Sequence, residues 1–214
     1  MTQTLDARGF LFDMDGTLVD SHAVVERIWA NFAARFDLDL ADILATSHGV
    51  RMVETIRRHA PAGTDAEALT LELGAIEVLD TDGVVEIPGA RDFVGRLPAS
   101  SVALVTSATL PLAASRMESI GVPMPGAVVT AEDVERGKPQ PDCYLRAAEL
   151  LGVAPSDAIV FEDAEAGISA GLAAGMRVVV VGSWESEITV GLPRIADYAD
   201  ATVTVRDGIT SISL

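Results

Sequence analysis

The sequence predicts an α/β fold, in which helices cover both faces of a parallel sheet and a separate all-helical segment is inserted near the N-terminus. Two observations support this prediction. Short apolar runs alternate with helical patterns through the second half of the chain, whereas residues 21–83 hold helical patterns and no convincing strand. A chain of 214 residues, 49% of them apolar, is long enough to bury such a core.

The strands are predicted from apolar runs that are too short for helices and end in turn-forming or acidic residues. In order, they are Gly9–Phe12, Val102–Val105, Ala127–Val129, Ile159–Phe161, Val178–Val181 and Thr202–Val205. Helical patterns of about three turns lie between most of them, at Leu110–Ile120, Asp142–Leu151 and Ala164–Ala174. This alternation favours a single parallel sheet with crossover helices.

The inserted segment is predicted to form a helical cap over the sheet. Ser21 can cap a first helix that continues to Phe36. Thr64 and Glu67 form a plausible capping box for a later helix at Asp65–Leu79. The predicted division is therefore a core of residues 1–17 and 88–214 and a cap of residues 18–87.

Polar side chains gather where the predicted strands end. In open α/β sheets, ligands bind beyond the carboxyl ends of the strands, so these side chains are expected to share one site. They are Asp13 and Asp15, Thr106 and Ser107, Thr130, and Glu162 and Asp163.

The acidic pairs at two of these ends predict a metal site. Asp13 and Asp15 could be turn formers alone, but a second acidic pair, Glu162 and Asp163, follows another strand. Converging carboxylates repel one another, and a hard cation such as Mg²⁺ suits them. With such a metal, one aspartate can accept a phosphoryl group while a second acid protonates the leaving alkoxide and later deprotonates water.

Two further segments fit phosphate binding. Thr106 and Ser107 precede a helix, where hydroxyl and backbone N–H groups can bind phosphate as well as cap the helix. Lys138 is the only lysine in the chain and lies in a Gly-Lys-Pro loop. Lys138 could be a solvated surface lysine, but the fact that the only lysine falls in this loop favours a point charge that holds the nucleophile and the phosphate.

Composition restricts the partners and the compartment. A formal charge of −17 argues against nucleic acid and against anionic membrane surfaces. Cys143, the single cysteine, excludes an internal disulfide and fits a reducing, cytoplasmic setting. Residues 1–8 show no signal-peptide pattern, and no apolar run has membrane-spanning length. We expect a small phosphorylated metabolite as the partner, and a monomer or weak homodimer.

Four ordered motifs resemble those of haloacid dehalogenase superfamily phosphatases, and together they extend over nearly the whole chain. They are Asp13–Ser21 (DMDGTLVDS), Val105–Ser107 (VTS), Gly137–Pro139 (GKP) and Phe161–Gly167 (FEDAEAG). The resemblance implies a Rossmann-like core, an inserted helical cap and dependence on Mg²⁺.

The resemblance also implies a role for each motif residue. Asp13 is similar to the family's nucleophile and metal ligand, and Asp15 to its acid/base with a backbone carbonyl on the metal. Thr106 and the Ser107 backbone resemble the phosphate-binding groups, and Lys138 the clamping lysine. The remaining motif residues are Glu162 and Asp163, similar to the metal-holding acids, and Gly16, which lets the chain turn towards the cap.

Within the superfamily, the cap resembles that of enzymes acting on glycerol phosphates and on sugar or deoxysugar phosphates. Ser47–Arg51 (SHGVR) carries this resemblance, so His48, Gly49 and Arg51 are predicted to contact the substrate, although they could be ordinary loop residues. His22 and His59 are interpreted as structural.

Two other functions remain as alternatives. Hexose phosphomutases of the superfamily carry a histidine where this chain has Val25, which disfavours that activity. Signalling receivers also phosphorylate an aspartate, but they lack a cap, and Asp15 would hydrolyse the product quickly.

Overall fold

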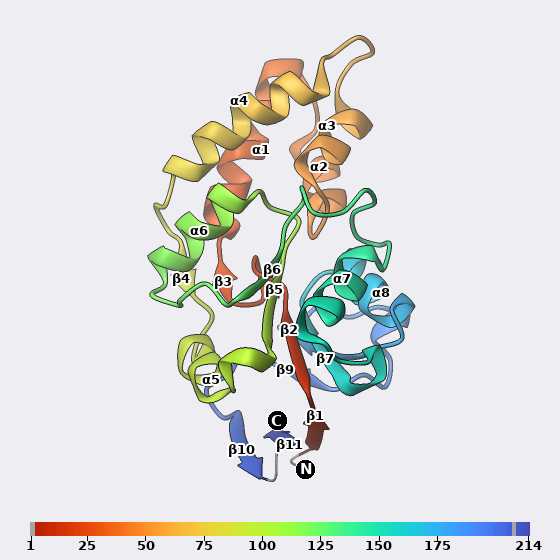
Figure 1. Ribbon diagram of the computed structural model, residues 1–214. Helices are drawn as coiled ribbons and strands as arrows, with labels where there is room; N and C mark the ends of the chain where they lie inside the picture. Colours follow the sequence, from red (N-terminus) through yellow and green to blue (C-terminus); the bar gives the residue numbers. More distant parts are fainter. Residues whose placement is uncertain (1–2, 207–208) are drawn as a thin grey trace.

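The computed structural model describes residues 3–206 and 209–214, and its centre is a six-stranded parallel sheet (Figure 1). The strand order is β6-β5-β2-β7-β8-β9, and every neighbouring pair is parallel. The strands are β2 (Gly9–Phe12), β5 (Val102–Val105), β6 (Ala127–Val129), β7 (Ala158–Glu162), β8 (Arg177–Val181) and β9 (Arg194–Ile195). The predicted parallel sheet is therefore confirmed.

Helices cover both faces of this sheet, as predicted. α5 (Ala90–Arg96) and α6 (Leu110–Ser119) lie on one face, and α7 (Asp142–Leu151) and α8 (Glu165–Ala173) on the other (Figure 1). Because side chains alternate along a strand, Phe10 and Phe12 of β2 join the core under α5 and α6, whereas Leu11 joins the core under α7 and α8. Single-turn 3-10 helices lie at Ala99–Ser101, Pro155–Asp157 and Glu187–Thr189.

Four helices between the first and second core strands form a layer above the carboxyl ends of the sheet (Figure 1). They are α1 (His22–Phe36), α2 (Leu40–Ser47), α3 (Met52–His59) and α4 (Ala66–Leu79). A two-stranded antiparallel ribbon, β3 (Val19–Asp20) and β4 (Val85–Glu86), joins them to the core. The exact division into a core and a cap at residues 18–87 stays a prediction.

Both predicted helix caps in this layer are wrong in detail. Ser21 precedes α1 but makes no capping hydrogen bond, because its hydroxyl donates to Asp15 instead. Asp65, not Thr64, caps α4 by accepting from the backbone N–H of Ala68, whereas the Thr64 hydroxyl donates to the carbonyl of Pro61.

The strand predicted at Thr202–Val205 does not belong to the parallel sheet. It forms β10 (Thr202–Arg206), which pairs antiparallel with β11 (Ile209–Ser213), and β11 also pairs with β1 (Thr4–Ala7). Most of β10 is exposed, so it lacks the two covered faces of a central parallel strand. Residues 1, 2, 207 and 208, which the predicted core includes, lie outside the described residues.

No helix in the described ranges has both the length and the apolar character needed to cross a bilayer.

Candidate active site

The sheet order places the predicted site residues at adjacent strand ends. β2 lies between β5 and β7, with Phe12 in register with Leu104 and Phe161. Asp13, Thr106 and Glu162 therefore end or follow three neighbouring strands, and they converge although they lie far apart in the sequence.

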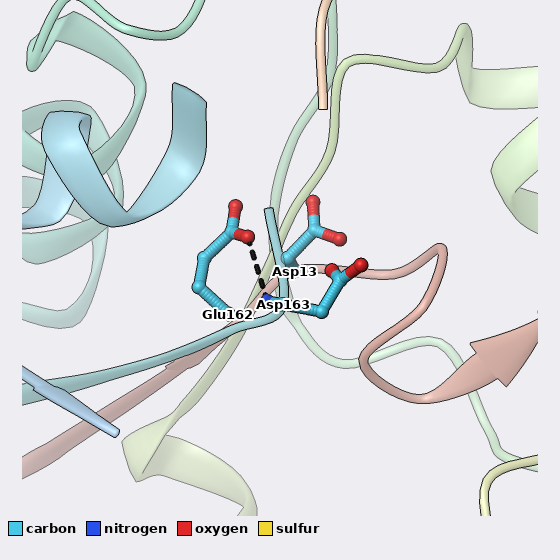
Figure 2. Close-up of side chains that lie close together, drawn as sticks. All are labelled: Asp13, Glu162 and Asp163. Carbon is cyan, nitrogen blue, oxygen red and sulfur yellow. Dashed lines mark hydrogen bonds between the residues drawn. The ribbon is translucent and has the colours of Figure 1, made fainter. Parts of the chain in front are cut away.

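Three carboxylates meet at this edge. Asp13, Glu162 and Asp163 each present an oxygen within 4.8 Å of the others, and Figure 2 shows the three side chains side by side. Gly16 has a φ of +83°, and a Cβ there would lie 2.0 Å from the Asp163 carboxylate, so only glycine allows this close approach. The structure thus brings the predicted metal-holding acids together.

The crowding of these acids favours a cation among them. Burial raises the pKa of Asp13 from its ordinary value of 3.8 to about 8, although Lys138 opposes the rise. Burial, and then the neighbouring charge of Glu162, raise the pKa of Asp163 well above its ordinary value. The buried Asp13 and the half-buried Asp163 present carboxylate oxygens whose charge a cation would stabilise, an all-oxygen donor set suited to Mg²⁺.

Glu162 lies close to the other two acids but has more hydrogen-bond partners than they do. Its Oε1 accepts from Lys138 Nζ at 2.7 Å and from the Tyr144 hydroxyl at 3.0 Å. Its Oε2 accepts from the backbone N–H of Asp163 at 2.9 Å (Figure 2) and from that of Ala164 at 3.1 Å. These contacts use about four lone-pair positions, whereas among the described residues the Asp13 carboxylate accepts only from Lys138 and the Asp163 carboxylate only from Thr17, so these two acids have more oxygen positions open to a metal.

Lys138 lies buried at the centre of the site. Its ammonium donates to Asp13, to Glu162 and, at 3.2 Å, to the carbonyl of Val105, and its side chain is 1% exposed. A buried ammonium persists only with such partners, so the surface-lysine reading is wrong.

Asp15 faces the space between the cap and the core. Its Oδ1 accepts from the Ser21 hydroxyl at 2.7 Å and from the guanidinium of Arg116. Sequence reasoning missed Arg116. The available signal was a charged residue on the buried side of the helix that begins at Leu110, beside Ala113 and Met117.

The two hydroxyl residues after β5 have separate contacts. Thr106 Oγ1 accepts from the backbone N–H of Ala108 at 3.0 Å, and Thr106 also lines the cavity. Ser107 donates to the carbonyl of Gly49 in the cap at 2.8 Å. The helix α6 begins later, after Thr109, whose side chain makes no capping bond.

The predicted cap residues lie at the contact between cap and core. Arg51 donates to Glu54 Oε1 at 2.9 Å and reaches the carbonyl of Glu135 in the core at 3.2 Å. His48 is exposed, and its ring centroid is 5.8 Å from that of His22. His22 lines the same cavity, so its interpretation as purely structural missed that position.

A cavity of about 650 Å³ lies between these groups. Its lining includes Asp13, Asp15, Thr106 and Asp163 from the core. Each arginine that lines it is paired with a carboxylate in the described chain: Arg51 with Glu54, Arg57 with Glu67, and Arg116 with Asp15 and Glu77. Glu132 and Glu135 add further negative charge to the wall.

A profile of the haloacid dehalogenase-like hydrolases matches residues 7–175, which hold every predicted site residue. The chain belongs to this family.

Named relatives of this hydrolase agree with that placement. Hexitol phosphatase A of Escherichia coli is 45% identical over 81% of this chain and 82% of its own. Glycerol-1-phosphate phosphohydrolase 2 of Saccharomyces cerevisiae is 33% identical over 82% of this chain and 75% of its own. The crystal structure of β-phosphoglucomutase from Clostridium difficile has a TM-score of 0.78 at 21% identity, covering 90% of this chain and 92% of that one, which shows the shared fold alone.

Proposed function

We propose that this hydrolase cleaves a small phosphate monoester of a sugar, polyol or glycerol through a phosphoaspartate on Asp13, with Mg²⁺ as cofactor. The enzyme is a phosphoric monoester hydrolase, as its family and its named relatives indicate. One observation carries the mechanism: Asp13, Asp15 and Asp163 line one cavity, and Lys138 lies against Asp13.

The residues divide the chemistry as follows. Asp13, Asp163 and the backbone of Asp15 would hold Mg²⁺, which supplies positive charge against the phosphate oxygens. An oxygen of Asp13 attacks phosphorus, and Asp15 gives a proton to the leaving ester oxygen. Asp15 then takes a proton from the water that hydrolyses the acyl phosphate. Lys138 orients Asp13, and Thr106 with the Ser107 backbone would bind phosphate oxygens.

The charges of the cavity support a neutral leaving group. Its three arginines are already paired, and its other charged lining is acidic, so a second phosphate or a carboxylate on the substrate would meet no free guanidinium among the described residues. The arginine–carboxylate pairs offer both donors and acceptors, which suit the hydroxyl groups of a sugar or polyol. We propose that His48, Gly49 and Arg51 contribute to this part of the site.

The hexose phosphomutase alternative has the weaker support. Val25 lies in the cavity wall where that activity would need a histidine, and the paired arginines disfavour the bisphosphate that a mutase must hold. A signalling receiver is weaker still, since four cap helices lie over the phosphorylation site. We further propose a cytoplasmic enzyme that acts as a monomer or weak homodimer.

A substrate panel tests the proposed function. Phosphate release from glycerol 1-phosphate, hexitol phosphates, hexose phosphates and a sugar bisphosphate would be measured with Mg²⁺ and with EDTA. We expect Mg²⁺-dependent release from the singly phosphorylated polyols and sugars and much slower release from the bisphosphate. Release from none of them, with Asp13→Asn as the blank, would sink the proposal.

A further inference from the structure

A buried arginine connects the acid/base candidate to the cap. Arg116 comes from α6 of the core, and its side chain is 4% exposed. One terminal nitrogen donates to Asp15 Oδ1 and the other to Glu77 Oε1 in the last turn of α4, while its Nε has no hydrogen-bond partner in the described structure. A single guanidinium thus bridges the cap and Asp15.

The bridge fixes one oxygen of Asp15 in particular. Oδ1 accepts from both Ser21 and Arg116, whereas no hydrogen bond to Oδ2 is present in the described structure. In the proposed mechanism, the proton that goes to the leaving ester oxygen, and later comes from water, would be carried on Oδ2, the oxygen without these donors. The direction in which Oδ2 points is set by the two donors on Oδ1.

Glu77 also pairs with Arg116. Its carboxylate is buried, and the guanidinium of Arg116 is the partner that compensates its charge. Withdrawal of α4 from the core would remove Glu77 from Arg116 and leave the guanidinium free to turn. Asp15 would then lose one of the two donors that orient it.

We infer that Arg116 is a positioning residue through which closure of the cap orients Asp15 for proton transfer. Glu77 holds the guanidinium, and the guanidinium holds Oδ1. This inference rests on the proposed function, because it concerns the acid that serves a phosphate ester. In the open enzyme Asp15 is held less firmly, so transfer to water or to a poorly placed ester is slower.

The same pair of helices provides a matched control. Ser115, next to Arg116 on α6, donates its hydroxyl to the carbonyl of Val78, next to Glu77 on α4, at 2.9 Å. This contact also joins cap to core but has no connection to Asp15. If Arg116 had only a structural role between the helices, its substitution would have the same effect on catalysis as substitution of Ser115.

The test compares two substrates in four proteins: wild type, Glu77→Gln, Arg116→Lys and Ser115→Ala. One substrate is the alkyl monoester that wild type cleaves fastest in the panel above, and the other is p-nitrophenyl phosphate, whose leaving group needs little protonation. We expect the alkyl-to-aryl ratio of kcat/KM to fall about tenfold or more in Glu77→Gln and Arg116→Lys. In Ser115→Ala it should stay within about twofold of wild type.

Several results would overturn the inference. An unchanged alkyl-to-aryl ratio of kcat/KM in folded Glu77→Gln, or an equal fall in Ser115→Ala, would mean that Arg116 has only a structural role between the two helices. Glu77→Gln should also have no effect on the ratio when Asp15 is already Asn, and a full effect there would contradict the chain of contacts. Glu77→Gln preserves side-chain shape, so it decides the question even if Arg116→Lys does not fold. A wild type that cleaves neither ester would instead refute the proposed function.

Discussion

Replacement of Lys138 by arginine tests whether the site needs a compact ammonium or only a positive charge. The ammonium donates in three directions, to Asp13, to Glu162 Oε1 at 2.7 Å and to Val105 O at 3.2 Å, within a fully buried space. A guanidinium is planar and longer, so it cannot donate to all three acceptors from this position.

The size of the effect follows from those contacts. If arginine loses two charge-assisted hydrogen bonds of about 1.5 kcal/mol each, the activation free energy rises by about 3 kcal/mol, and kcat/KM falls about a hundredfold. Lys138→Met removes the cation between two buried carboxylates and should lower the free energy of unfolding by about 3–5 kcal/mol in the metal-free protein.

The assay is phosphate release with Mg²⁺, together with urea unfolding in EDTA. Arg136→Lys is the matched control, because Arg136 lies two residues away and pairs with Asp142 on the surface at 2.9 Å. It should behave like wild type. A Lys138→Arg enzyme within about threefold of the wild-type kcat/KM would refute the geometric argument.

Four further outcomes are expected. Asp15→Asn should lose about 10²–10⁴-fold in kcat on an alkyl ester in stopped assays while still binding Mg²⁺ by calorimetry, and unchanged turnover would exclude the acid/base role. EDTA should abolish phosphate release and Mg²⁺ restore it, so full activity in excess chelator would contradict a metal-dependent mechanism. Because the pKa of Asp13 is raised to about 8, its contribution to stability is present below about pH 4 and is lost as pH rises through about 8 in the metal-free protein. Mg²⁺ should therefore raise the melting temperature more at about pH 8 than at about pH 6, and the opposite order would refute that assignment. His48→Ala and Arg51→Ala should change KM or the ranking of natural esters more than the kcat/KM of p-nitrophenyl phosphate, and equal losses on all esters would indicate damage to the fold.

Much of the core could be predicted because its signals are local. The buried strand at Gly9–Phe12 and its neighbours are continuous apolar runs, and parallel sheets bring their carboxyl ends together. That rule alone predicted that Asp13 and Asp163 would meet. Strand β9 has only two residues, which is too short to recognise, and β10 is recognisable as a strand, but its sequence does not show that it is mostly exposed and lies outside the parallel sheet.

The site details that escaped prediction depend on contacts between distant segments. Arg116 and Glu77 are 39 positions apart, and nothing in either helix pattern shows that their charges compensate each other. Likewise, the acidic pair does not reveal that Glu162 accepts from Lys138 and Tyr144 whereas Asp163 accepts from Thr17, because these partners come from other segments of the chain. Sequence patterns therefore predict which residue types lie at the site, whereas the hydrogen-bond partners of each side chain depend on tertiary packing.

Trapping the phosphorylated enzyme tests the central claim most directly. Wild type and Asp15→Asn would be mixed with p-nitrophenyl phosphate and Mg²⁺, quenched in acid within one turnover, and mapped by peptide mass spectrometry. We predict one phosphoryl group on Asp13, removable by hydroxylamine, that accumulates further in Asp15→Asn because its hydrolysis lacks a base. Phosphate on Thr106 or Ser107, or complete turnover with no phosphorylated enzyme in either protein, would contradict the account.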